Sequence, residues 1–368
     1  MNTVVRRMAA GIDSGVFPGA VLLAARGEEI LIHRAFGVTD IFSCAEVTAD
    51  TAFDLASLTK PLATAAAVMV LAAGGALTLD APLAGVLPEF RHTEKAGVSI
   101  VQLLTHTSGF PAWRPVYRAL RRMPQHDRKP ALERMLVAMP LVDRPGRRTI
   151  YSDLGYMVLA WVVERVSGQA MDAFLDASVY GPLGVGGLFF PGPEYPGPDD
   201  SVAATEFCPW RNVLLSGRVH DDNADAAGGV AGHAGLFGTA RGVHRLLSCM
   251  LAACHGDATP GVLPQDLVRR FFTPWGRSGR TPGFDRPEGP CSSAGRHFSI
   301  HSVGHLGFTG TSFWMDVDRR IIVVLLTNRV HPSRSNIGIR AFRPLIHDDV
   351  MEMVRRGSGA SKSACNGR

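Results

Sequence analysis

The chain has 368 residues, of which 46% are hydrophobic and 19% charged, a composition that suits a folded protein with one large core or two lobes. Its net charge of +5 comes from local basic clusters that lack the aromatic interleaving typical of nucleic-acid-binding surfaces. No apolar run reaches the roughly 18 uncharged residues that a membrane span needs. We therefore expect neither nucleic-acid binding nor a membrane span. The clusters comprise Arg114, Arg118, Arg121, Arg122, Arg128 and Lys129, and near the C-terminus Arg355, Arg356, Lys362 and Arg368.

The first forty residues predict a helix followed by a β-hairpin. Residues 3–15 have a mixed, helical pattern without the continuous apolar stretch of a secretory signal, so we expect a cytoplasmic protein. Residues 20–25 and 30–36 are two apolar runs joined by a polar turn, which is the pattern of a hairpin. The six cysteines of the chain show no CxxC spacing, which favours reduced thiols over a zinc site or a disulfide framework.

The motif Ser57-Leu58-Thr59-Lys60 places a serine and a lysine three residues apart where an apolar helix begins. Pro61 suits a first helical turn, and strong helix formers follow it. Residues three apart share a helix face, so the Lys60 ammonium can reach the Ser57 hydroxyl and, if burial lowers its pKa, activate it as a nucleophile. The alternative interpretation is an N-capping serine beside a solvated lysine.

Residues 78–200 predict mostly helical segments separated by glycine and proline, of which 156–167 is the clearest. Tyr151 lies on the loop before that helix, where a phenol near Lys60 could act as a general acid or base. The alternative is a tyrosine that anchors the loop through its hydroxyl. His106 is expected to fix a turn rather than bind a metal, since the chain has no HExxH spacing.

Two glycine-rich segments follow. Residues 228–239 form a loop that matches neither GxGxxG nor a Walker motif, so we do not expect nucleotide binding. Residues 304–311 lie at a strand start, where edge N–H groups could polarise a substrate carbonyl, although a plain hairpin bend is the alternative. The chain also lacks the GxSxG elbow of α/β-hydrolases.

The C-terminal third changes to a strand pattern. Residues 297–303, 308–317 and 320–327 predict an antiparallel meander, and a helix near 337–356 should pack on it. Residues 357–368 are small and polar and predict a disordered tail.

Strand-forming segments at both chain ends predict an α/β (α+β) fold, in which helices flank an antiparallel sheet and an all-α lobe is inserted between its halves. We expect a single catalytic domain over 1–356, with an α/β lobe of about 1–77 and 202–356, a helical lobe of about 78–201 and the active site in the cleft.

These motifs, in this order, resemble the serine β-lactamase and penicillin-binding-protein superfamily, in particular its class C β-lactamase-like branch of esterases and D-amino-acid peptidases. The resemblance rests on Ser57-Leu58-Thr59-Lys60, residues 103–109, Tyr151-Ser152-Asp153, the loop 228–239 and His305-Leu306-Gly307. It implies that Ser57 is acylated, that Lys60 and Tyr151 share proton transfer, and that the backbone N–H groups of Ser57 and Phe308 form an oxyanion hole. Further substrate-binding or supporting residues are expected at Asp153, His305, Gly307 and Thr309.

Two positions depart from the penicillin-active members of that superfamily. Asp153 stands where they carry the asparagine of Tyr-x-Asn, so an amide donor becomes an anionic acceptor. His305-Leu306-Gly307 stands where they carry Lys-Thr-Gly. This change removes a fixed charge and a hydroxyl from the expected anion site and leaves an imidazole that should titrate near neutrality.

We therefore expect a serine hydrolase of small-molecule carboxylic esters or small amides, without cofactor or metal, and with ester hydrolysis preferred. A β-lactamase or a D-alanyl-D-alanine-type carboxypeptidase is the alternative within this chemistry. A non-catalytic ligand sensor with the same fold is the alternative outside it, but such a sensor would not need Ser57, Lys60 and Tyr151 together.

Overall fold

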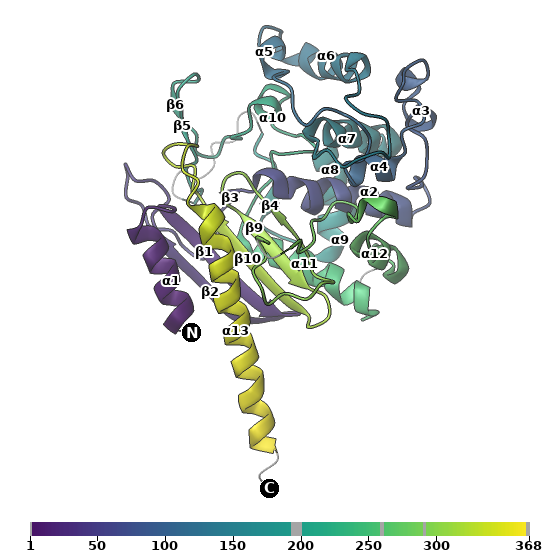
Figure 1. The fold of residues 1–368 in the computed structure, drawn as a ribbon. Coiled ribbons are helices and arrows are strands. Elements are labelled where there is room, and N and C mark those ends of the chain that lie inside the picture. Colours follow the sequence, from purple (N-terminus) through teal and green to yellow (C-terminus); the bar gives the residue numbers. More distant parts are fainter. Residues whose placement is uncertain (1, 193–200, 258–260, 290–291, 366–368) are drawn as a thin grey trace.

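The computed structural model describes residues 2–192, 201–257, 261–289 and 292–365. Its centre is a five-stranded antiparallel sheet in the order β2-β1-β10-β9-β8, so both chain ends contribute to one sheet (Figure 1). The strands are β1 (Gly19–Arg26), β2 (Glu29–Gly37), β8 (Val303–Leu306), β9 (Ser312–Asp316) and β10 (Ile321–Thr327). The predicted α/β fold with a sheet built from both ends is confirmed.

Helices cover both faces of this sheet and form a layer of their own beside it (Figure 1). Those near the sheet are α1 (Asn2–Asp13), α2 (Ala66–Ala73), α11 (Ala240–His255), α12 (Gln265–Phe272) and α13 (Ile339–Cys365), whereas α10 (Asp222–Ala226) lies against the inserted layer. The inserted layer contains α3 (Leu83–Val86), α4 (Ile100–Leu104), α5 (Tyr117–Leu120), α6 (Gln125–Ala138), α7 (Asp153–Ser167), α8 (Met171–Leu175) and α9 (Gly181–Leu183). Two small sheets pair β3 (Phe53–Asp54), β7 (Phe237–Gly238) and β4 (Leu188–Phe189), and β5 (Phe207–Cys208) with β6 (Val213–Leu214).

Alternate residues of β1 face two different cores. Ala20, Leu22 and Ala24 belong to a cluster with α1 and α13, which lie side by side on one face (Figure 1). Val21 and Leu23 point the other way, into the large core that includes α2, α7 and α11. Side chains alternate along a strand, so burial on both faces explains why the strand reads as one continuous apolar run.

The structure corrects three predicted boundaries. The first strand of the meander starts at Val303 instead of residue 297, and the second at Ser312 instead of 308, because residues 307–311 form a turn in which the Gly307 N–H donates to Thr311 O. The last helix continues to Cys365, past the predicted end at 356, so the tail predicted as disordered from residue 357 is helical as far as Cys365. Residues 366–368 lie outside the described part of the chain.

The helix that carries the Ser57 motif is a core element. The stretch Ala56–Ala73 is long and apolar enough, by length and composition alone, to cross a membrane, but 78% of it is buried inside the protein. This burial is typical of the central helix of a folded domain. The cysteines whose pairing the structure describes, Cys44, Cys208, Cys249 and Cys254, are free thiols.

Candidate active site

Ser57 lies where the chain leaves β3 and enters the helical layer. Ala56–Leu58 form a 3-10 turn and Lys60–Ala65 a π-helical turn before α2 begins, so the predicted single α-helix is in fact three successive helix types. Ala56 has a φ of +47°, a strained conformation for a residue with a side chain and one that clusters at functional sites. The Asp54 carboxylate stabilises this turn by accepting the Ala56 N–H at 2.8 Å.

Lys60 is fully buried, and its ammonium contacts Asp153 Oδ1 at 2.7 Å, Ser57 Oγ at 3.1 Å and His233 O at 3.1 Å. An ammonium has three N–H donors, which these acceptors match in number. Burial lowers the pKa of Lys60, but the opposite charge of Asp153, assisted by Tyr151, outweighs burial and raises it above its usual value. The lysine is therefore held in its ammonium form, and the expected lowering of its pKa by burial is overturned by the ion pair.

Tyr151 closes the group from the loop before α7, as its position in the sequence predicted. Its ring centre lies 4.7 Å from the Lys60 ammonium, and its hydroxyl is close enough to Lys60 and Ser57 for both to influence its pKa, although the residue as a whole is 37% exposed. Burial of the hydroxyl raises the pKa of the phenol, and the charge of Asp153 adds to this, whereas Lys60 opposes it. The structure thus brings Ser57, Lys60, Tyr151 and Asp153 together, with Asp153 in direct contact with the ammonium.

His106 holds the loop that carries Tyr151 in place. It has a φ of +58° and is buried, and its Nδ1 accepts the Ser152 N–H at 2.9 Å. Its ring lies 4.4 Å from the ring of Tyr151, centroid to centroid. Burial, followed by the charges of Arg280 and Lys60, holds the pKa of His106 well below its usual range. The contact agrees with the prediction that this histidine fixes a turn.

The turn between β8 and β9 carries Phe308, the second expected oxyanion donor. Within the described residues the Phe308 N–H has no hydrogen-bond acceptor, and the side chain is 50% exposed at the pocket. Thr309 Oγ1 donates to Asp54 O at 2.7 Å and Thr311 Oγ1 to Leu55 O at 3.1 Å. These two bonds tie the turn to the segment before Ser57, so the two N–H groups are fixed relative to each other.

Two buried arginines, which sequence reasoning missed, hold the same turn. Arg343 of α13 donates to Gly307 O at 2.9 Å and to Thr311 O at 2.8 Å, and Arg329 donates to Phe308 O at 2.8 Å. Burial, with Arg329 nearby, lowers the pKa of Arg343 to about 9. A cation on Gly307 O polarises the peptide group whose N–H belongs to Phe308 and makes that N–H a stronger donor. No local motif signals this role, because the residues meet only in the folded chain.

Of the supporting residues predicted on this strand, none lines the pocket beside Ser57. Thr309 is buried and bonded to backbone, and a Cβ on Gly307 would clash with the side chain of Thr311. His305 is 3% exposed and its Nδ1 contacts Leu306 O at 2.9 Å. Burial lowers the pKa of His305 to about 4, so the predicted titration near neutrality is wrong.

A pocket of about 420 Å³ opens beside Ser57. Trp113 and Phe308, 43% and 50% exposed, line it together with small alanine side chains. Asp153 also lines it, as expected for a residue in contact with substrate. Exposed aromatic surface next to the serine can cover an apolar acyl or leaving group.

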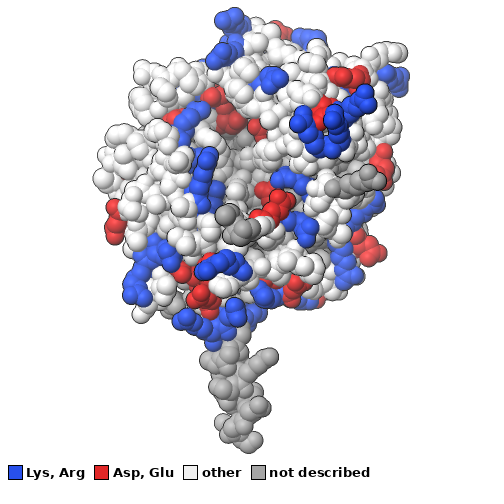
Figure 2. Space-filling view, in the orientation of Figure 1, with Lys and Arg blue, Asp and Glu red and all other residues white. Residues whose placement is uncertain are grey.

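The far wall of the pocket consists of ion pairs that no sequence motif indicated. Glu206 contacts His220 at 3.1 Å and accepts from Arg334 Nε at 2.7 Å, and Asp221 pairs with His233 at 2.9 Å. Burial raises the pKa of Glu206, but the hydrogen bonds from His220 and Arg334 prevail and lower it to about 2. Figure 2 shows acidic atoms beside a hollow on this face, near α10. Arg334, the cation of this wall, is therefore already neutralised.

The sequence and the fold are similar to known proteins. A family model described as Beta-lactamase matches residues 4–346. A protein of Escherichia coli K12 with the provisional name D-alanyl-D-alanine carboxypeptidase is 31% identical over 373 residues, which cover 90% of this chain and 82% of that protein. A Salmonella agona protein with the same provisional name is 30% identical over 358 residues, which cover 88% and 82%.

Solved structures share the fold at low sequence identity. D-alanine carboxypeptidase AmpC from Burkholderia cenocepacia matches with a TM-score of 0.72 at 19% identity, over 95% of this chain and 98% of that one. EstCE1, a hydrolase with promiscuous acyltransferase activity, matches with a TM-score of 0.72 at 22% identity, over 93% and 99%. At these identities both likenesses show a shared overall fold.

Proposed function

We propose that Ser57 is the nucleophile of this chain, which belongs to the beta-lactamase family and is a serine hydrolase. We further propose that the chain hydrolyses carboxylic esters or small amides, and that it prefers esters to β-lactams. One observation carries this proposal. A buried Lys60 contacts Ser57 Oγ at 3.1 Å and the Asp153 carboxylate at 2.7 Å, so a proton can leave the serine along a preformed path.

Acylation begins with attack of Ser57 Oγ on the substrate carbonyl carbon. Lys60 is an ammonium at rest, so it can accept the serine proton only as it passes one of its own to Asp153. Asp153 is thus the final acceptor of the serine proton, and Lys60 relays the proton to it. The carbonyl oxygen, now an oxyanion, is stabilised by the N–H groups of Ser57 and Phe308.

Tyr151 is proposed as the acid that completes this step. Its hydroxyl lies close to Lys60 and Ser57 and its raised pKa keeps it protonated, so it can donate a proton to the departing alkoxide. The phenolate that results is reprotonated through Lys60 by the proton that Asp153 received. Water then replaces the alcohol and the same groups act in reverse, which releases the acid and restores Ser57.

The charges of the pocket favour a neutral substrate over an anionic one. Asp153 and Asp221 line it, and its guanidinium, Arg334, is already bonded to Glu206. A substrate carboxylate, as in a β-lactam, would meet these carboxylates without finding an unpaired cation. A neutral ester requires only apolar surface and the two N–H donors.

A second candidate is D-alanyl-D-alanine-type carboxypeptidase activity. The name of the 31% identical relative favours it, and so does the position of Arg334 at the pocket, where a peptide carboxylate could displace Glu206. This activity requires an existing ion pair to break, so we rank it below ester hydrolysis.

A panel of substrates tests the proposal. We expect kcat/KM for p-nitrophenyl butyrate to exceed that for nitrocefin by at least about 100-fold, with no release of D-alanine from diacetyl-L-lysyl-D-alanyl-D-alanine. Ser57→Ala measures the uncatalysed background. Equal or faster turnover of nitrocefin would make the chain a β-lactamase, and faster release of D-alanine would make it a carboxypeptidase.

A further inference from the structure

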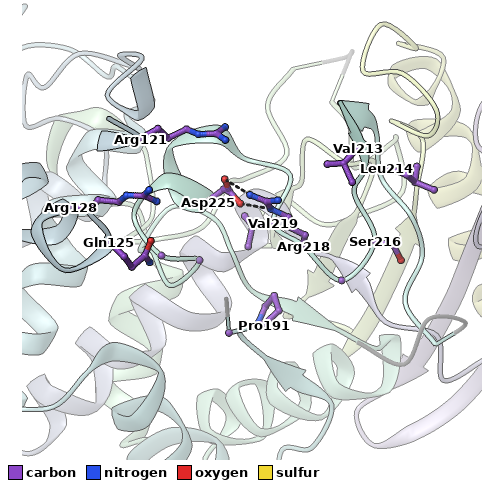
Figure 3. A pocket seen from close by; sticks show the side chains of 14 residues that line it. Arg121, Gln125, Arg128, Pro191, Val213, Leu214, Ser216, Arg218, Val219 and Asp225 are labelled. Carbon is purple, nitrogen blue, oxygen red and sulfur yellow. Dashed lines mark hydrogen bonds and ion pairs between the residues drawn. The ribbon is translucent and has the colours of Figure 1, made fainter. Parts of the chain in front are cut away.

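A second pocket, of about 480 Å³ and drawn in Figure 3, shares a chain segment of its lining with the pocket beside Ser57. The chain segment that carries α10 forms this wall. His220 and Asp221 line the Ser57 side, whereas Arg218 and Asp225 line the second pocket. The two pockets are thus neighbours with separate linings, and the proposed hydrolysis does not use the second one.

Three guanidinium groups converge on the second pocket, and we call it the arginine pocket after Arg121, Arg128 and Arg218. Figure 3 shows Arg121 and Arg128 reaching from α5 and α6 toward the pair formed by Arg218 and Asp225. Asp225 is the carboxylate of this lining, and Arg218 binds it twice, at 2.8 and 3.3 Å. The four side chains together carry a charge of +2.

Arg121 and Arg128 have no carboxylate partner in the described part of the chain. Arg121 is held by stacking, with its guanidinium carbon 4.1 Å from the centre of the Trp210 ring. Arg128 donates through Nε to Met123 O at 3.1 Å, which leaves its terminal nitrogens available. Two guanidinium groups held around one concave space repel each other, and an anion bound between them offsets this electrostatic repulsion.

We propose that the arginine pocket binds the phosphate group of a small phosphate monoester. A phosphate monoester carries a charge of about −2 near neutral pH, which balances the +2 of the lining. Guanidinium groups match its oxygens in paired hydrogen bonds, and the volume leaves room for an organic group on the phosphate. Gly228 and Gly229, which also line the pocket, allow a ligand to approach the backbone closely.

The pocket is distinct from the general basic surface of α5. Figure 2 shows Lys and Arg atoms gathered over this part of the molecule. Arg118 and Arg122 belong to the same sequence cluster as Arg121 and Arg128, but they do not line the pocket. They therefore offer matched controls, because a diffuse basic surface would depend on all of these residues equally.

Calorimetric titration with phenyl phosphate and with benzoate, at constant chloride concentration, tests the proposal. We expect saturable one-to-one binding of phenyl phosphate, at least about 10-fold tighter than binding of the singly charged benzoate. Arg128→Gln and Arg121→Gln should each weaken binding about 10-fold, and Arg122→Gln should not. Binding should also weaken as the pH falls from 7.5 to 5, because the phosphate loses its second charge near pH 6 while the arginines keep theirs.

The same titration after covalent modification of Ser57 with a fluorophosphonate separates the two pockets. Binding of phenyl phosphate should persist, since the arginine pocket does not include Ser57. Loss of binding after modification would place the anion in the Ser57 pocket and overturn the proposal. Absence of saturable binding, or an equal loss in Arg122→Gln, would overturn it as well. None of these outcomes depends on whether the chain hydrolyses esters.

Discussion

Two walls meet at Ser57, and they differ in charge. The helical wall provides Lys60, Tyr151 and Asp153, a cation, a phenol and an anion in mutual contact. The wall from the sheet provides the half-exposed Phe308 at the pocket, with His305, whose pKa is lowered to about 4, behind it. Its two arginines are bonded to backbone carbonyls of the turn, so this wall presents no charged side chain to the pocket. Proton transfer is thus confined to one wall, while the other positions a backbone N–H. Changes in the first should alter the pH dependence of catalysis, and changes in the second should alter stability more than rate.

The largest effect on catalysis is expected at Ser57, where the two walls meet. Ser57→Ala removes the hydroxyl that forms the covalent intermediate, so hydrolysis of p-nitrophenyl butyrate should fall below a few per cent of the wild-type rate. The half-buried site tolerates a smaller side chain, so the melting temperature should change little. Ser43→Ala, at an exposed serine, is the control. Substantial residual activity would identify another nucleophile.

On the charged wall, Lys60→Ala and Tyr151→Phe should each lower kcat by roughly 10²–10⁴, the usual contribution of a positioned acid or base. Because the two groups act as one unit, the double variant should lose far less than the product of the single losses. Steady-state kinetics of the three variants, with the exposed Lys129→Ala as control, measures this. Strictly multiplicative losses would show that the residues act independently.

Asp153→Asn tests whether the Asp153 carboxylate is the final acceptor of the serine proton. Without the carboxylate, burial is the main influence left on Lys60 and its pKa should fall. The reaction then requires loss of a proton from Lys60 itself, so kcat/KM at pH 7 should drop about 10- to 100-fold and rise between pH 7 and 9. The wild type, whose reaction does not require this loss of a proton from Lys60, should be nearly flat over that range. A variant profile that matched the wild type would assign the base elsewhere.

The smallest catalytic effect is expected on the wall from the sheet. His305 stays neutral down to about pH 4 in the folded chain, whereas an unfolded histidine binds its proton near pH 6.5. The unfolded state therefore gains protons first, and stability should fall by about 3 kcal/mol as the pH drops from 6.5 to 4. Urea unfolding across that range should show a shallower loss in His305→Gln, with ester kcat/KM changed only a few-fold. An equal slope in both proteins would contradict the assignment.

The difference between the walls also explains what the sequence could predict. Ser57 and Lys60 meet through helix spacing, and Tyr151 and Asp153 lie two residues apart where α7 begins, so short motifs were enough to find the charged group. The titration of His305, a residue of β8, depends on the burial of its side chain in the folded chain, which no local pattern reports. Arg343 acts on Gly307, and Arg334 on Glu206, across long separations in sequence, so only the folded chain brings them together.

Intact-protein mass spectrometry after incubation with a fluorophosphonate tests the central claim, an activated Ser57, most directly. We predict one covalent adduct per chain, mapped to the peptide that contains Ser57, and none in Ser57→Ala. The adduct should form much more slowly in Lys60→Ala, because the relay that accepts the serine proton is broken. A protein that stays unmodified, or an adduct on any other residue, would contradict the account.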